Sequence, residues 1–170
     1  MDKKIETILN EQLNKEFWSG YLYLSMCGYF EFKNLQGFAN WMRVQYQEEL
    51  THAMKFFDFI CERGGKVSLL PIDPVKTKWK DHIEIFEETL KHEKYVTSCI
   101  NEIVNTSMEC KDFATHNFLQ WYIEEQVEEE ANASLILDQL KMIGDDKNAL
   151  LMMDRELGTR VFVDTTKPTA

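Results

Sequence analysis

Four long stretches of this chain repeat apolar residues at alternating spacings of three and four, which is the pattern of a helix with one buried face. They run over about 5–33, 38–64, 83–107 and 119–140, and Gly144 closes the last one. A shorter amphipathic stretch covers about 146–157, and a polar tail follows to residue 170. Only 7 Gly and 3 Pro occur, too few for the many turns of a β-sandwich or barrel. The sequence therefore predicts an all-α protein.

The second and third stretches are separated by an irregular segment, 65–80, that contains Pro71 and Pro74. Fully extended, its roughly 16 residues reach about 50 Å, comparable to the ~45 Å of a 30-residue helix. The turns near Asn34 and Lys111 are short, so each joins two antiparallel helices. We expect a four-helix bundle over about 5–144 with one long crossover, a short fifth helix, and a single domain over 1–170.

Each apolar stripe is interrupted near its middle by side chains that bind metal ions: Glu16 in the first, Glu49 and His52 in the second, Glu93 in the third, Gln126 and Glu129 in the fourth. Counting residues from each short turn places the metal-binding side chains of the two joined helices at nearly the same height along the bundle. If the second and third helices are parallel, both pairs lie in one layer. The spacing thus predicts that these side chains converge.

The negative charge of four carboxylates in an apolar layer must be compensated, because burying each anion costs roughly several kcal/mol. No Lys or Arg lies on the four stripes, so the compensation is either protonation or metal. Two divalent ions would balance four glutamates, and the Glu-x-x-His pattern at 49–52 is a ligand pattern of di-iron sites in helical bundles. The corresponding position in the fourth helix holds Glu129 instead of a histidine.

Segments 10–16, 47–52, 91–93 and 118–130 resemble the bacterial non-haem ferritins, and the resemblance covers nearly the whole chain. It implies a ferritin-like fold and an iron storage protein with ferroxidase activity. Such a protein oxidises Fe(II) to Fe(III) at a di-iron site and stores the product as a ferric mineral inside a homo-oligomeric shell of 24 subunits. The partners implied are therefore copies of the same chain, Fe(II), and dioxygen or hydrogen peroxide.

The resemblance also implies roles for individual residues. Glu16, Glu49 and His52 would hold the first iron, with Glu49 bridging to a second iron served by Glu93, Gln126 and Glu129. Tyr23 matches a tyrosine beside the di-iron centre, and Trp121 an adjacent aromatic residue. Residues matching a third iron site are Glu48, Glu125 and Glu128, together with a shared Glu129.

Two differences from related iron-binding families indicate which cofactors and domains this chain should lack. Leu50 and Glu129 stand where the haem-binding ferritins carry methionine and histidine, so we expect no haem. The four cysteines form no C-x-x-C pair, which argues against a rubrerythrin-type iron domain and suits reduced thiols in the cytoplasm.

Charge and hydropathy exclude two classes of partner. The net charge of −10 repels nucleic-acid phosphates and attracts cations. The longest uncharged run, Phe17 to Phe30, is about 14 residues, short of the roughly 20 that a membrane helix needs. Two alternatives stay open: a di-iron oxidase or peroxidase without storage, and a purely structural helical bundle or interaction module.

Overall fold

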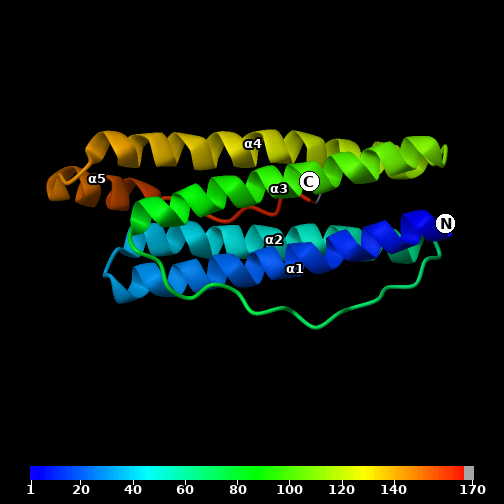
Figure 1. Ribbon diagram of the computed structural model, residues 1–170, viewed down its shortest axis with the longest axis horizontal. Helices are drawn as coiled ribbons and strands as arrows, with labels where there is room; N and C mark the ends of the chain where they lie inside the picture. The colour runs from blue at the N-terminus through cyan, green and yellow to red at the C-terminus, as the bar shows by residue number, and fades with distance from the viewer. Residues whose placement is uncertain (167–170) are drawn as a thin grey trace. The chain divides into compact units, whose positions relative to one another are not determined.

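The computed structural model describes residues 1–166, and these residues form five α-helices and no strand. The helices are α1 (Lys3–Phe32), α2 (Gln36–Glu62), α3 (His82–Glu109), α4 (Phe113–Ile143) and α5 (Lys147–Leu157) (Figure 1). The predicted all-α class and the five predicted segments are confirmed. The end of the predicted polar tail lies outside the described residues.

Three of the helices begin at an aspartate that caps them. The Asp81 carboxylate accepts a hydrogen bond of 2.9 Å from the backbone N–H of Glu84 at the start of α3. Asp112 and Asp146 accept equivalent bonds at the starts of α4 and α5. Each cap satisfies a backbone donor that the first helical turn would otherwise leave without a partner.

Backbone contacts divide the chain into two compact units. One contains Met1–Leu9 with Lys80–Gly144, and in it α3 packs along α4 (Figure 1). The other contains Asn10–Trp79 with the described residues from Asp145 onward, and in it α2 packs against α5. The expectation of a single domain stays a prediction.

The buried face of α3 differs slightly from the predicted one. Counting from Ile83 at spacings of three and four, the sequence predicts a buried stripe through Leu90 and Val104. These three residues are only half-buried, and the helix buries Ile85, Val96 and Ile103 more completely. All six residues are apolar, so the helical period alone could not choose between two neighbouring phases. Glu93 lies on the face that both phases share, and its burial is unaffected.

The segment between α2 and α3 runs along α1. Near one end Asn10 Nδ2 donates to the backbone carbonyl of Lys66 at 3.0 Å, and further along Ser25 Oγ donates to that of Lys76 at 2.8 Å. The two attachment points are separated by roughly 22 Å of helix at ~1.5 Å per residue. The crossover therefore follows the helix lengthwise, as its length predicted.

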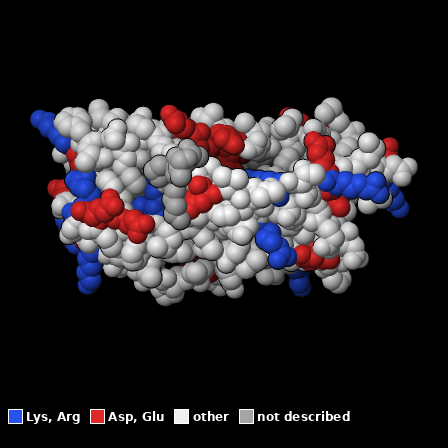
Figure 2. Space-filling model, turned by 180° about the vertical axis from the view of Figure 1, so that it is seen from behind, with Lys and Arg blue, Asp and Glu red and all other residues white. Residues whose placement is uncertain are grey.

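Charged side chains are spread over the surface. On the face drawn in Figure 2, acidic and basic side chains form small separate groups between uncharged ones. The sequence as a whole has 29 acidic and 19 basic residues, a net charge of −10. None of the described helices has the length and apolar composition needed to span a bilayer.

Candidate metal centre

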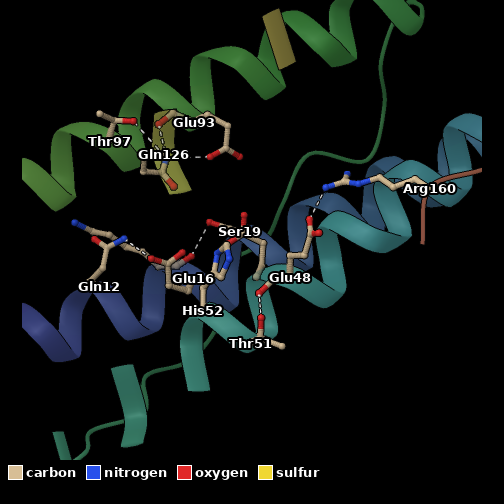
Figure 3. A network of polar contacts seen from close by, with 12 residues as sticks. Gln12, Glu16, Ser19, Glu48, Thr51, His52, Glu93, Thr97, Gln126 and Arg160 are labelled. Carbon is tan, nitrogen blue, oxygen red and sulfur yellow. Dashed lines mark hydrogen bonds and ion pairs between the residues drawn. The ribbon is translucent and has the colours of Figure 1, made fainter. Parts of the chain in front are cut away.

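Three predicted ligands come together between α1 and α2. Glu16, Glu49 and His52 each offer one ligand atom, and these atoms all lie within 4.8 Å of one another. The three residues are only 1%, 2% and 3% exposed. Glu49 and His52 lie one turn apart on α2, with 3.5 Å between Glu49 Oε2 and His52 Nδ1. Figure 3 shows the Glu16 carboxylate and the His52 ring turned toward each other from the two helices.

A buried amide orients the first of these carboxylates. Gln12 lies one turn before Glu16 on α1, is 1% exposed, and donates from Nε2 to Glu16 Oε1 at 2.8 Å (Figure 3). Its own Oε1 is buried without a hydrogen-bond partner among the described residues. Sequence reasoning assigned no role to Gln12. The i, i+4 spacing on the buried side of a ligand helix was the signal that could have identified it.

The chemistry of this half-site fits a divalent cation. Two carboxylates lie close together where water does not reach them, so their charges repel and their desolvation is costly. An imidazole nitrogen and hard carboxylate oxygens are together a donor set for iron and similar ions. Shared coordination of one cation would turn the repulsion between Glu16 and Glu49 into attraction to a common partner.

The second predicted group lies in the α3–α4 unit. Glu93, Gln126 and Glu129 are 1%, 4% and 4% exposed. Gln126 Nε2 lies 3.2 Å from Glu93 Oε2, 3.2 Å from the Glu93 carbonyl and 3.3 Å from Thr97 Oγ1 (Figure 3). Glu129 lies on the same buried face of α4, one turn after Gln126. The neutral Gln126 amide thus donates a hydrogen bond to the Glu93 carboxylate.

His92, the residue before Glu93, adds no positive charge at neutral pH. The adjacent His92 has its pKa lowered to about 4 because burial desolvates the ring, so it is neutral at pH 7. The Thr97 hydroxyl, which accepts from Gln126, donates in turn to Glu130 Oε1 at 2.6 Å. A pocket of about 380 Å³ between α3 and α4 is lined in part by Thr97, Gln126 and Glu130, and it brings solvent up to the Gln126 side chain.

The two groups belong to different compact units, so their convergence into one di-iron site stays a prediction. Tyr23 is fully buried on α1, two turns after Glu16. Trp121 is half-buried on α4, and its ring packs edge-on against Tyr122 with 4.9 Å between ring centroids.

The residues predicted for a third iron site differ in their surroundings. Glu125 is half-buried and Glu128 is exposed on α4. Glu48, on α2, is half-buried and its Oε2 forms an ion pair of 2.6 Å with Nη2 of Arg160 (Figure 3). No sequence pattern indicated this pair, because the two residues are 112 positions apart. The third iron site stays a prediction.

Comparison with known proteins identifies the family. Residues 6–143 match the ferritin-like domain family. The chain is 41% identical to the bacterial non-heme ferritin of Bacteroides fragilis, covering 94% of this chain and 99% of that protein. It is 39% identical to a probable bacterial non-heme ferritin-like protein of Haemophilus influenzae, over 93% of this chain and 96% of that protein.

Solved structures agree with the sequence comparison. A form of the Archaeoglobus fulgidus ferritin engineered to be closed is 52% identical, with a TM-score of 0.95 over 96% of this chain and 99% of that one. The open-pore ferritin of the same archaeon, also 52% identical, has a TM-score of 0.94 over 95% and 99% of the two chains. The expected ferritin fold is thereby confirmed, and the chain belongs to the ferritin family.

Proposed function

We propose that this chain is an iron-storage ferroxidase whose di-iron site is built from Glu16, Glu49, His52, Glu93, Gln126 and Glu129. The observation that carries the proposal is the buried Glu16–Glu49–His52 group, whose ligand atoms lie within 4.8 Å of one another in a member of the ferritin family. Iron is the substrate of this site, and haem has no part in the proposal.

The α1–α2 ligands take up one Fe(II), and Glu49 bridges to a second Fe(II) served by the α3–α4 ligands. Each ion gives up one electron, and dioxygen takes the pair with two protons to become hydrogen peroxide. Delivering two electrons together avoids a one-electron oxygen radical. Hard carboxylate oxygens favour the Fe(III) that results. Peroxide, where it is the oxidant, would accept the same two electrons.

The two half-sites should hold iron with different strength. Glu16, Glu49 and His52 form a set with two anionic ligands, whereas Gln126 contributes a neutral amide that already donates to Glu93 at 3.2 Å. Iron entering the α3–α4 half-site must turn this amide, so that its oxygen faces the ion. We expect the second ion to bind more weakly, which suits an ion that moves on to storage.

Storage requires assembly. Members of this family form homo-oligomeric shells, and we propose 24 copies of this chain around a ferric mineral in the cytoplasm. The net charge of −10 on each chain would draw cations toward such a shell. Tyr23, buried two turns after Glu16, is proposed as an electron donor beside the site.

The test is an anaerobic Fe(II) titration of the native protein followed by addition of oxygen. Absorbance follows Fe(III) formation, and particle mass follows mineral growth. Two tightly bound Fe(II) per chain, rapid oxidation and an increase of particle mass support the proposal. Rapid oxidation with no retained iron favours an oxidase without storage. No oxidation above the rate in buffer contradicts the proposal.

A further inference from the structure

The C-terminal segment, residues 158–166, lies against one face of α2 in the same compact unit. It begins where α5 is anchored to the start of that helix. The backbone N–H groups of Gly37 and Phe38 donate to Asp154 Oδ1 at 2.8 and 3.0 Å. Further on, Asn40 Nδ2 donates to the carbonyl of Arg160 at 2.9 Å. Hydrogen bonds between side chains and backbone groups therefore fix the end of α5 and the start of the segment to the first turns of α2.

The segment continues along a single stripe of α2. Trp41, Glu48 and Lys55 are spaced by seven residues and so share a helix face. The Arg160 guanidinium lies over the Trp41 ring, 4.7 Å from its centroid, and its Nη2 bonds Glu48. Asp164 acts on Lys55, since it opposes the lowering of the lysine pKa by burial. Two residues of the stripe, Trp41 and Glu48, thus contact the segment, and the third, Lys55, feels the charge of Asp164.

The middle contact places a fixed cation beside the candidate metal ligands. Glu48 directly precedes Glu49 in the sequence, and its side chain is 15% exposed, against 23% for the Arg160 side chain. Stacking on Trp41 holds the guanidinium in place, so the charge is more firmly positioned than that of a flexible surface lysine. A carboxylate bound in this way is poorly available to a metal ion, because the guanidinium occupies its oxygen and repels a second cation.

We propose that Arg160 is a tethered cation that holds the Glu48 carboxylate and excludes a metal ion from it, so that the C-terminal segment limits metal binding next to the di-iron site. This inference rests on the proposed function. It assigns to the segment the control of a third metal site. Iron reaches Glu48 only when Arg160 leaves, and the native chain binds two Fe(II) ions tightly.

Equilibrium dialysis of the native assembly against Fe(II) under argon, with iron counted per chain, tests this. We expect two ions per chain for the wild type and three for Arg160→Ala. Arg160→Gln, which keeps a polar side chain but removes the charge, should also bind three. Glu48→Gln alone should bind two, because Glu48 is not a ligand in the native chain. Arg160→Ala combined with Glu48→Gln should return to two.

Arg155→Ala is the matched control, since Arg155 is an exposed arginine of α5 and its loss changes the net charge equally. It should bind two ions. Equal counts in the wild type and both Arg160 variants would overturn the proposal, and so would a gain in Arg155→Ala or a loss in Glu48→Gln alone. If no variant binds Fe(II), the di-iron function itself fails, and this inference fails with it. Retained native mass shows that the variants are folded.

Discussion

Two carboxylates and an imidazole that water does not reach define the chemistry of the α1–α2 half-site. Glu16, Glu49 and His52 were predicted from their positions on apolar stripes, because a charged side chain at such a position needs a partner. The structure brings these three together within 4.8 Å. The contact between Glu48 and Arg160 was not predictable, because no pattern in the sequence around either residue indicated it.

Removing a direct ligand should abolish the reaction. We expect Glu49→Ala and His52→Ala each to lower the initial rate of aerobic Fe(II) oxidation by more than about 100-fold, since loss of even an outer partner of a metal ligand costs about 10–100-fold. Stopped-flow absorbance of Fe(III) formation measures this. Glu11→Ala, an exposed glutamate of α1, is the control and should keep the wild-type rate. Wild-type rates in both ligand variants would exclude these residues from the site.

Gln12 should affect iron binding indirectly, by positioning the Glu16 carboxylate. Its amide holds the carboxylate at 2.8 Å, and we expect Gln12→Leu, which keeps the volume and removes the donor, to weaken Fe(II) binding at the first site about tenfold. Anaerobic calorimetric titration measures the affinity. Gln139→Leu, a change of the same kind at a half-buried position of α4, should leave it unchanged. An unchanged affinity in Gln12→Leu would show that the amide does not position the ligand.

At the scale of helices, the sequence predicted the elements well and their rotation less well. A capping aspartate is a local signal, so the start of α3 was readable from the sequence at Asp81. The turns near Asn34 and Lys111 were also expected, and both residues adopt left-handed backbone with φ of 58° and 54°. The phase of α3 was ambiguous because apolar residues cover more than one stripe. The packing of the folded protein decides it.

The junction between α2 and α5 should depend on one glycine. A Cβ on Gly37 would lie 1.5 Å from the Asp154 carbonyl oxygen, so Gly37→Ala must separate the two helices. We expect a loss of about 1–3 kcal/mol in unfolding free energy, typical of overpacking. Gly28→Ala is the matched control: a Cβ there meets nothing within 4 Å, and removing a mid-helix glycine should stabilise by about 0.5–1 kcal/mol. Urea unfolding at equal protein concentration distinguishes them, and equal effects would refute the close contact.

The cap of α3 should be sensitive to pH. The backbone hydrogen bond from Glu84 lowers the pKa of Asp81 below its ordinary value of 3.8. The ionised cap therefore stabilises the folded state above that value and is lost as pH falls through the lower folded pKa. Asp81→Ala should cost about 1 kcal/mol at pH 7, and the difference from the wild type should shrink below about pH 3.8. Urea unfolding midpoints of both proteins across a range of pH measure this difference in stability. A difference that does not change with pH would rule out a charged cap.

For the molecule as a whole, the crossover was predictable because its length and the length of the helices are both set by chain geometry. Assembly was not, since nothing in one chain labels an interface. The structure offers a candidate: Leu69, Leu70 and Ile72 in the crossover are 61%, 57% and 50% exposed. Adjacent large apolar side chains in water favour burial against another subunit.

Native mass tests the assembly. We expect the wild-type protein to have about 24 times the chain mass of 20.1 kDa, and Leu70→Asp to shift it to small oligomers. Thr77→Asp, at an exposed polar position of the same crossover, should keep the full assembly. Light scattering after size exclusion reports the mass. A full-size Leu70→Asp particle would remove the crossover from the interface, and a wild-type particle of one to four chains would exclude storage in a shell.

The central claim is that buried ligands from two helix pairs meet around iron. Crystals soaked in Fe(II) under argon and measured at the iron absorption edge test it most directly. The account predicts two anomalous peaks per chain, one bound by Glu16, Glu49 and His52 and the other by Glu49, Glu93, Glu129 and the turned amide of Gln126. Peaks elsewhere, or an empty site in which the two groups stand apart, would contradict it.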